Sequence, residues 1–169
     1  APTIALKVFK AAYTSDGTPQ SELAAGLAAG QHPNLLTPLA AVTGAPDGQL
    51  AMALPLLSTD MQPLAEPPSF ESCTRDIYAP QLRLSPDVAH RLLQSIRAAV
   101  QHLHQRGLLH GDLYAHNTLC NLRTGEAVLS DMGAAALLDG LPEKQKAQLQ
   151  QIELRALRIL EAEIQARTN

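Results

Sequence analysis

Residues 108–121, with the sequence LLHGDLYAHNTLCN, concentrate polar side chains between apolar flanks. Polar groups bordered this closely by core-forming residues usually cost stability, so their placement calls for a chemical reason. Asp112 and Asn117 lie five positions apart in this stretch, and Asp131 follows fourteen positions after Asn117. Two carboxylates and one amide side chain therefore lie within one stretch of twenty residues.

Phosphoryl transfer is a chemistry that needs such a set. It requires a carboxylate to orient the attacking hydroxyl, oxygen ligands for Mg²⁺ and a fixed cation on the phosphates. Asp112 could be the orienting carboxylate, and Asn117 and Asp131 could be the metal ligands. Lys7 could supply the cation if the fold brings it to the same place.

The elements around this stretch are expected to present it on loops. Residues 85–107 predict a helix, because Ser85 can cap it, Pro86 suits its first position and Gly107 can end it. Residues 118–131 then predict a hairpin with its turn at residues 123–125. Asp112 and Asn117 would thus lie between a helix and a hairpin, and Asp131 would lie at the hairpin's end.

The N-terminal part is expected to be a small β-rich unit with one helix. Residues 3–9 alternate as a strand, with Ala5, Lys7 and Phe9 on one face. A turn near residues 15–18, a helix over residues 19–30 and two short strands within residues 32–57 follow.

The remaining chain is expected to join this unit to a helical part. Six prolines between residues 55 and 86 argue against any long regular element there. The last segment, from about Leu141, predicts a helix with one apolar face formed by Leu149, Ile152, Ala156, Leu160 and Ile164. Two lobes with a ligand cleft between them are the expected arrangement.

Composition narrows the classes of partner. The chain has 169 residues, a net charge of −3 and 46% hydrophobic residues, with no run of like charges. We therefore expect no nucleic-acid partner and no membrane partner. The two separated cysteines, Cys73 and Cys120, predict reduced thiols and a cytoplasmic protein. The missing initiator Met suggests a piece of a longer chain. The four histidines of residues 102–116 are not expected to hold a metal, because His102 and His104 lie two positions apart on a helix and point to different faces.

Several motifs, in the same order along the chain, resemble those of protein kinases. They are HGDLYAHN at 110–117 for the catalytic loop, SDMG at 130–133 for the magnesium motif, IALK at 4–7 for the lysine strand and HPNLL at 32–36 after the following helix. The resemblance implies a two-lobed α+β protein-kinase-like fold. It is strongest to bacterial protein-kinase-like domains, which are often joined to leucine-rich repeats.

The resemblance also implies a division of the chain. Residues 1–57 would be an incomplete N-lobe that begins at the family's third strand. Residues 58–84 would be a proline-rich hinge or connector, and residues 85–169 a minimal C-lobe truncated after the helix that contains Glu153. In the family an acidic residue at that place braces the catalytic loop.

The family's roles can be carried over residue by residue. Asp112 would be the catalytic base, and Asn117 and Asp131 would bind Mg²⁺. Lys7 would hold the phosphates of ATP with Glu22 as its ion-pair partner. The adenine would lie between Ala5 and Leu119, against a hinge near residues 54–57 that includes Leu54 and Leu56.

Four departures from the family pattern limit these expectations. No glycine-rich loop precedes Lys7, and the segment after Asp131 is short and lacks the family's peptide-docking platform. Gly111 replaces the arginine that answers a phosphorylated loop, so control by such phosphorylation is not expected. Tyr114 replaces a lysine near the transferred phosphate, and a phenol supplies no cation at neutral pH, which predicts slow transfer or an unusual acceptor.

The sequence therefore predicts an ATP- and Mg²⁺-dependent phosphotransferase that acts on a hydroxyl, with protein as the main expected acceptor. Two alternatives remain open. One is a pseudokinase that serves as a binding or regulatory module, and the other is a kinase of small molecules.

Overall fold

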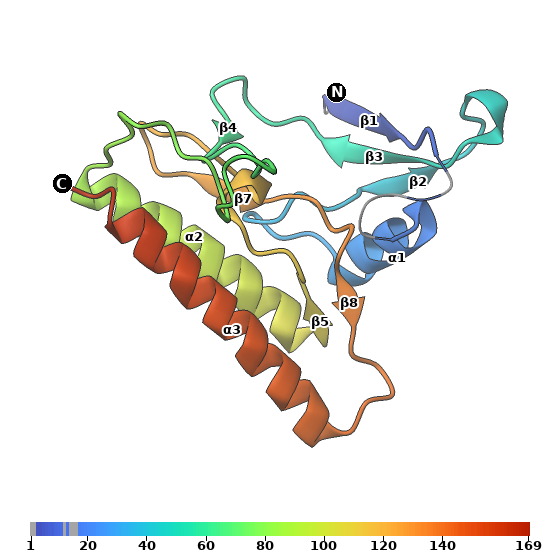
Figure 1. Cartoon of the computed structure of the whole chain (residues 1–169). Coiled ribbons are helices and arrows are strands. Elements are labelled where there is room, and N and C mark those ends of the chain that lie inside the picture. The colour runs from blue at the N-terminus through green and yellow to red at the C-terminus, as the bar shows by residue number, and fades with distance from the viewer. Residues whose placement is uncertain (1–2, 12, 14–16) are drawn as a thin grey trace.

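The computed structural model describes residues 3–11, 13 and 17–169, and most of the turn expected near residues 15–18 lies outside them. These described residues fold into small sheets and three α-helices (Figure 1). Its strands and helices are β1 Ile4–Val8, α1 Pro19–Ala29, β2 Ala40–Val42, β3 Ala51–Pro55, β4 Gln62–Pro63, α2 Pro86–Gln105, β5 Leu108–Leu109, β6 Thr118–Cys120, β7 Ala127–Leu129, β8 Ala136–Leu137 and α3 Glu143–Gln165.

The N-terminal strands form an antiparallel sheet in the order β1–β3–β2, with α1 nearby (Figure 1). Ala5 and Lys7 of β1 are half-buried and Phe9 is buried, whereas Ile4, Leu6 and Val8 are exposed. The prediction that Ala5, Lys7 and Phe9 share one face of the strand is therefore confirmed. Lys7 points inward with Phe9, because every second side chain lies on the same face.

Helix α2 follows the sequence prediction closely. The Ser85 hydroxyl accepts the backbone N–H of Val88 at 3.3 Å and caps the helix. One face of the helix is an apolar stripe that is buried in the main core; it consists of Val88, Leu92, Ile96, Ala99 and Leu103. Helix α3 lies alongside α2 (Figure 1), and a bridge between Leu84 and Thr168 joins the start of α2 to the end of α3. The two helices are therefore antiparallel.

The predicted apolar face of α3 is confirmed at Leu160 and Ile164, which are buried, whereas Leu149 and Ala156 are half-buried and Ile152 is wrong. Ile152 is 67% exposed, and the buried residues of this helix are Glu153, Leu157, Leu160 and Ile164. Glu153 is buried because its carboxylate accepts hydrogen bonds from His104 and Gly111, which offset the cost of burial. A carboxylate therefore lies on the buried side of α3, which hydropathy alone does not select.

Residues 58–84 form no long regular element, as the prolines predict, yet they do more than connect. They contribute β4, which pairs with the β6–β7 hairpin, and four core residues, Leu64, Ala65, Leu82 and Leu84. Both cysteines are free: Cys73 is exposed, and burial raises the pKa of the Cys120 thiol to about 12. Within the described part of the chain, no helix is long and apolar enough to cross a membrane.

Candidate active site

The loop between β5 and β6 joins the two polar residues singled out by their spacing. The Asn117 amide nitrogen donates to the Asp112 carboxylate at 2.7 Å and to the Asp112 carbonyl at 3.1 Å. Asn117 ends a single 3₁₀ turn, Ala115–Asn117, and is buried, whereas Asp112 is partly exposed. The Asp112 carboxylate is thus held in one place with access to solvent.

Asp131 reaches this loop through the end of β7. Ser130 donates its backbone N–H to the Asn117 carbonyl at 2.8 Å and its hydroxyl to the same oxygen at 3.1 Å. Asp131 follows with a left-handed backbone at φ 62°, and its carboxylate is exposed. One carboxylate oxygen accepts the Gly133 N–H at 3.1 Å. Asp131 thus directly follows a residue that is hydrogen-bonded to Asn117, and a left-handed backbone at a residue other than glycine is common at functional sites.

His110 lies beneath the loop as a buried structural residue. Its Nε2 donates to the Ser130 carbonyl at 3.0 Å, and its Nδ1 accepts the Asp112 N–H at 3.3 Å. Burial lowers the pKa of His110, an effect that the nearby carboxylates oppose only in part. The imidazole is therefore neutral, and it ties the magnesium-motif segment to the catalytic loop.

Glu153 of α3 supports the same loop from below. Its carboxylate accepts the Gly111 N–H at 2.8 Å and the His104 Nε2–H at 2.7 Å. Gly111 has φ 81°, and a Cβ at this position would lie 2.2 Å from the Ala134 carbonyl oxygen. Packing against the segment after Asp131 therefore requires glycine here. The sequence had suggested only the loss of an arginine.

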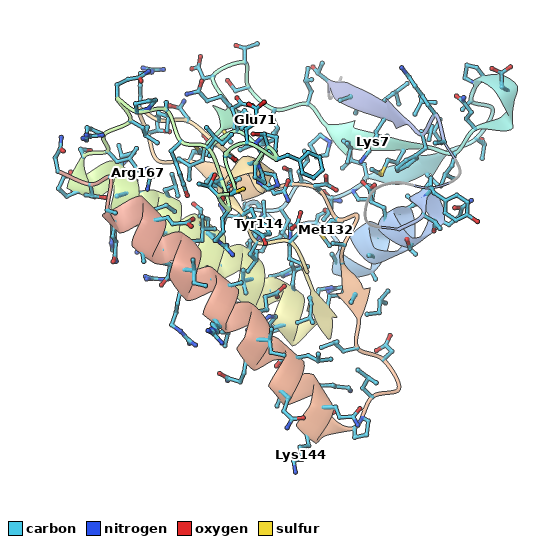
Figure 2. All side chains as sticks on the ribbon, in the orientation of Figure 1. Lys7, Glu71, Tyr114, Met132, Lys144 and Arg167 are labelled. Atoms are coloured by element: carbon cyan, nitrogen blue, oxygen red, sulfur yellow. The ribbon has the colours of Figure 1, made fainter. Side chains whose placement is uncertain are left out.

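A second group of predicted residues surrounds a cavity of about 240 Å³. The Lys7 ammonium lies 2.5 Å from the Glu22 carboxylate, which is buried. The lining residues are Lys7, Glu22, Leu36, Pro38, Met52, Leu54, Leu119, Ser130, Asp131 and Met132. Figure 2 shows Lys7 on the N-terminal sheet and Met132 on the segment below it. Asp131 belongs both to this lining and to the neighbourhood of Asn117, so the cavity and the loop form one site.

The other predicted nucleotide contacts lie outside the lining. Ala5 is half-buried on the same face of β1 as Lys7, whereas Leu56 is 55% exposed and its N–H donates to the Thr3 carbonyl. The Leu56 side chain is therefore exposed and does not line the cavity.

The oxygen donors fit a small divalent cation. Among the described residues, the Asn117 side-chain oxygen accepts no hydrogen bond, and Asp131 keeps an exposed carboxylate. Mg²⁺ prefers one or two protein oxygens together with water and phosphate, so Asn117 and Asp131 suit it. The described residues contain no cluster of three or more His, Cys, Asp and Glu side chains. The four histidines of residues 102–116 each have a separate partner.

The sequence analysis missed a polar segment in the proline-rich region. Arg75 and Asp76 both bind the catalytic loop, and Tyr78 binds α3. The only sequence signal was a charged pair, followed by Ile77 and Tyr78, within a stretch dominated by proline and small residues. Such a pair resembles a solvated turn until its partners are known.

The arrangement matches a known class of fold. The structure of the Cydia pomonella granulovirus kinase, PK-1, resembles this chain with a TM-score of 0.56 at 14% sequence identity. The match covers 81% of this chain and 46% of that kinase, so the chain spans less than half of its length. The predicted kinase-like fold is thereby confirmed.

The family follows from the sequence. The lipopolysaccharide kinase (Kdo/WaaP) family model matches residues 65–167, which is more than half of the 169 residues. The chain belongs to this family. The expected membership in the protein-kinase-like superfamily is confirmed, and the narrower likeness to domains joined to leucine-rich repeats stays a prediction.

Proposed function

We propose that this chain transfers the γ-phosphate of ATP to a hydroxyl group. The observation that carries the proposal is the junction of two half-sites at Asp131. On one side lies the Lys7–Glu22 pair, and on the other the hydrogen-bonded pair Asp112 and Asn117. This is the set of a carboxylate base, oxygen ligands and a cation that phosphoryl transfer requires.

Each residue has a role in this proposal. Asp112 accepts the proton of the acceptor hydroxyl as the oxygen bonds to the γ-phosphorus and the bond to ADP breaks. Lys7 holds the phosphates, and Glu22 fixes its side chain. Asn117 and Asp131 would hold Mg²⁺, which neutralises charge on the phosphates when it is bound. Ala5, Leu54 and Leu119 would contact the adenine, and Leu56 would contribute through its backbone.

The cavity suits part of a nucleotide. Its volume of about 240 Å³ lies below the roughly 300–1,000 Å³ usual for whole-ligand pockets. The base would enter between Leu54 and Leu119, and the phosphates would extend past Lys7 toward Asp131.

The acceptor is proposed to be a sugar hydroxyl on a glycolipid, because the family is named for lipopolysaccharide kinases. A protein hydroxyl is the second acceptor class, and the kept H-G-D-L-x-x-x-N spacing of the catalytic loop favours it. If neither the glycolipid nor the protein acceptor is phosphorylated, the alternative is that the chain is a pseudokinase.

The test begins with nucleotide binding. Mg-ATP should raise the Tm of the protein, because a ligand that binds only the folded state stabilises it. Radiolabelled ATP is then offered with lipopolysaccharide or with a general protein substrate. Asp112→Asn should lower transfer by about 100-fold or more while Mg-ATP still raises the Tm, since general-base catalysis contributes about 10²–10⁴-fold.

Asp47→Asn is the matched control, because Asp47 lies on the exposed turn between β2 and β3. It should transfer phosphate at the rate of the unsubstituted protein. Equal transfer by Asp112→Asn would remove Asp112 from its role. Binding of Mg-ATP without any transfer would support the pseudokinase alternative.

A further inference from the structure

Asp76 is a fully buried carboxylate whose hydrogen bonds all go to the catalytic loop. It accepts the backbone N–H of Ala115 at 3.0 Å, the N–H of His116 at 3.0 Å and the His116 Nδ1–H at 2.6 Å. A buried carboxylate is tolerated only where its oxygens are well satisfied. Here both partner residues belong to the three-residue turn Ala115–Asn117, which lies about forty positions after Asp76 in the chain.

The hydrogen bonds replace a missing local cap. The 3₁₀ turn Ala115–Asn117 follows Tyr114, whose side chain makes no capping hydrogen bond. The first N–H groups of a helical turn need acceptors, and Asp76 supplies them from the proline-rich segment. Asn117 is the last residue of this turn, and its amide holds the Asp112 carboxylate. Asp76 is therefore linked to both polar residues of the site through one short turn.

Arg75 contacts the residues of the same loop that directly precede the 3₁₀ turn. Its Nη2 donates to the Leu113 carbonyl at 3.1 Å, and its guanidinium lies 4.3 Å from the centre of the Tyr114 ring. Tyr114 in turn stacks on His116, with ring centres 5.3 Å apart. Figure 2 shows Tyr114 at the centre of the molecule, between the helices and the N-terminal sheet.

The segment that carries these residues is itself anchored. The Arg75 Nε donates to Glu163 of α3 at 3.2 Å, and the Tyr78 hydroxyl donates to the other oxygen of Glu163 at 3.0 Å. Glu66 and Ile77 exchange two backbone hydrogen bonds at 2.9 Å. Residues 75–78 are thus fixed to α3 and to residue 66 while Asp76 reaches into the loop.

We propose that Asp76 is a positioning residue for phosphoryl transfer, which caps the Ala115–Asn117 turn and thereby sets Asn117 and Asp112. The inference rests on the proposed function for its effect on catalysis. Its effect on the loop can be measured without any reaction.

The decisive variants are Asp76→Ala and Asp76→Asn, with Asn121→Ala as the matched control. The Asn121 side chain also accepts two backbone N–H groups of a turn, from Arg123 at 2.9 Å and Thr124 at 3.3 Å. That turn belongs to the β6–β7 hairpin and not to the catalytic loop. Asn121→Ala thus removes a similar pair of hydrogen bonds at another place.

Amide hydrogen exchange reports on the loop directly. Asp76→Asn should speed exchange within residues 112–118 by roughly tenfold, whereas Asn121→Ala should do so only within residues 121–126. Titration of Mg²⁺ at fixed ATP, followed by Tm, should show that Asp76→Asn binds Mg²⁺ more weakly, because Asn117 is a proposed ligand. The Mg²⁺ concentration for half of the Tm increase should rise about 10- to 100-fold in Asp76→Asn, as for other supports of metal ligands.

Kinetics should then separate positioning from general destabilisation. The kcat of Asp76→Asn should fall about 10- to 100-fold, with little change in ATP affinity measured without metal, and Asn121→Ala should keep its kcat. Unchanged exchange in residues 112–118, or equal kcat losses in Asp76→Asn and Asn121→Ala, would overturn the proposal. If exchange changes as expected but the unsubstituted protein transfers no phosphate, the proposed function fails and the positioning of the loop by Asp76 stands.

Discussion

Gly111 shows how a single residue can be required by a contact that the sequence does not reveal. In the kinase motif that residues 110–117 resemble, an arginine occupies the position of Gly111. In the structure Gly111 has φ 81° and lies against the carbonyl of Ala134, in the segment after the magnesium motif. The close approach of these two segments keeps Asp112 and Asp131 near each other, so the glycine contributes to the geometry of the site.

Gly111→Ala should therefore destabilise the protein strongly. We expect a loss of about 2–5 kcal/mol in the free energy of unfolding, of which about 1–2 reflects the left-handed backbone and about 1–3 the crowding against Ala134. Urea denaturation measures this loss. Gly140→Ala is the matched control, because Gly140 has φ 78° and open space around it. Gly140→Ala should lose only the part of the unfolding free energy that reflects the left-handed backbone. Equal losses in the two variants would show that the contact with Ala134 is unimportant.

At the scale of elements, helices position the site from opposite sides. Helix α1 holds Glu22 against Lys7. Its last carbonyls accept hydrogen bonds from two side chains at the end of α2: His102 of the last turn to Ala29 at 2.8 Å, and Arg106, directly after the helix, to Ala28 at 3.0 Å. These bonds satisfy acceptors that a helix end leaves open. Helix α3 supports the catalytic loop through Glu153.

Glu153→Ala should test the support from α3. The substitution leaves the Gly111 N–H and the His104 imidazole without their acceptor, in a buried place, so we expect a loss of about 1–3 kcal/mol in the free energy of unfolding. The control Glu143→Ala lies at the exposed start of the same helix and should change stability by less than about 0.5 kcal/mol. Similar losses in both variants would mean that Glu153 acts only through helix propensity.

The stability of the whole molecule should depend on pH through its buried histidine. Burial holds the pKa of His110 below its ordinary value of 6.5 in the folded state. The pKa of His32 is also lowered, by burial and then by the nearby His102. Below about pH 6.5 the unfolded chain therefore binds protons that the folded chain does not, and stability falls as the pH falls.

His110→Gln should reduce this dependence. Each such proton contributes up to about 1.4 kcal/mol per pH unit to the slope of unfolding free energy against pH. Urea denaturation between about pH 5 and 7 should show a shallower slope in His110→Gln, with the His32 contribution remaining. The matched control His90→Gln, on the exposed side of α2, should follow the unsubstituted protein. A slope in His110→Gln as steep as in the control would contradict the assignment.

Local patterns were sufficient for much of the fold. The alternation of residues 3–9, the capped helix at residues 85–107 and the hairpin after the catalytic loop each depend on neighbours within a few positions, so the sequence determined them. The spacing of Asp112, Asn117 and Asp131 likewise depends on one continuous stretch of chain. The motifs that resemble kinases were enough to predict the class of fold.

Contacts between distant segments were decided only by the tertiary structure. The burial of Glu153 on α3 follows from its two hydrogen bonds and not from its hydropathy. The exposure of Leu56, which keeps its side chain out of the cavity lining, was not evident from the sequence. Asp76 was inconspicuous in the sequence, since its two partner residues, Ala115 and His116, lie some forty residues away and no local pattern encodes such a separation. Burial and hydrogen bonding are properties of the assembled molecule, and they assigned these residues their places.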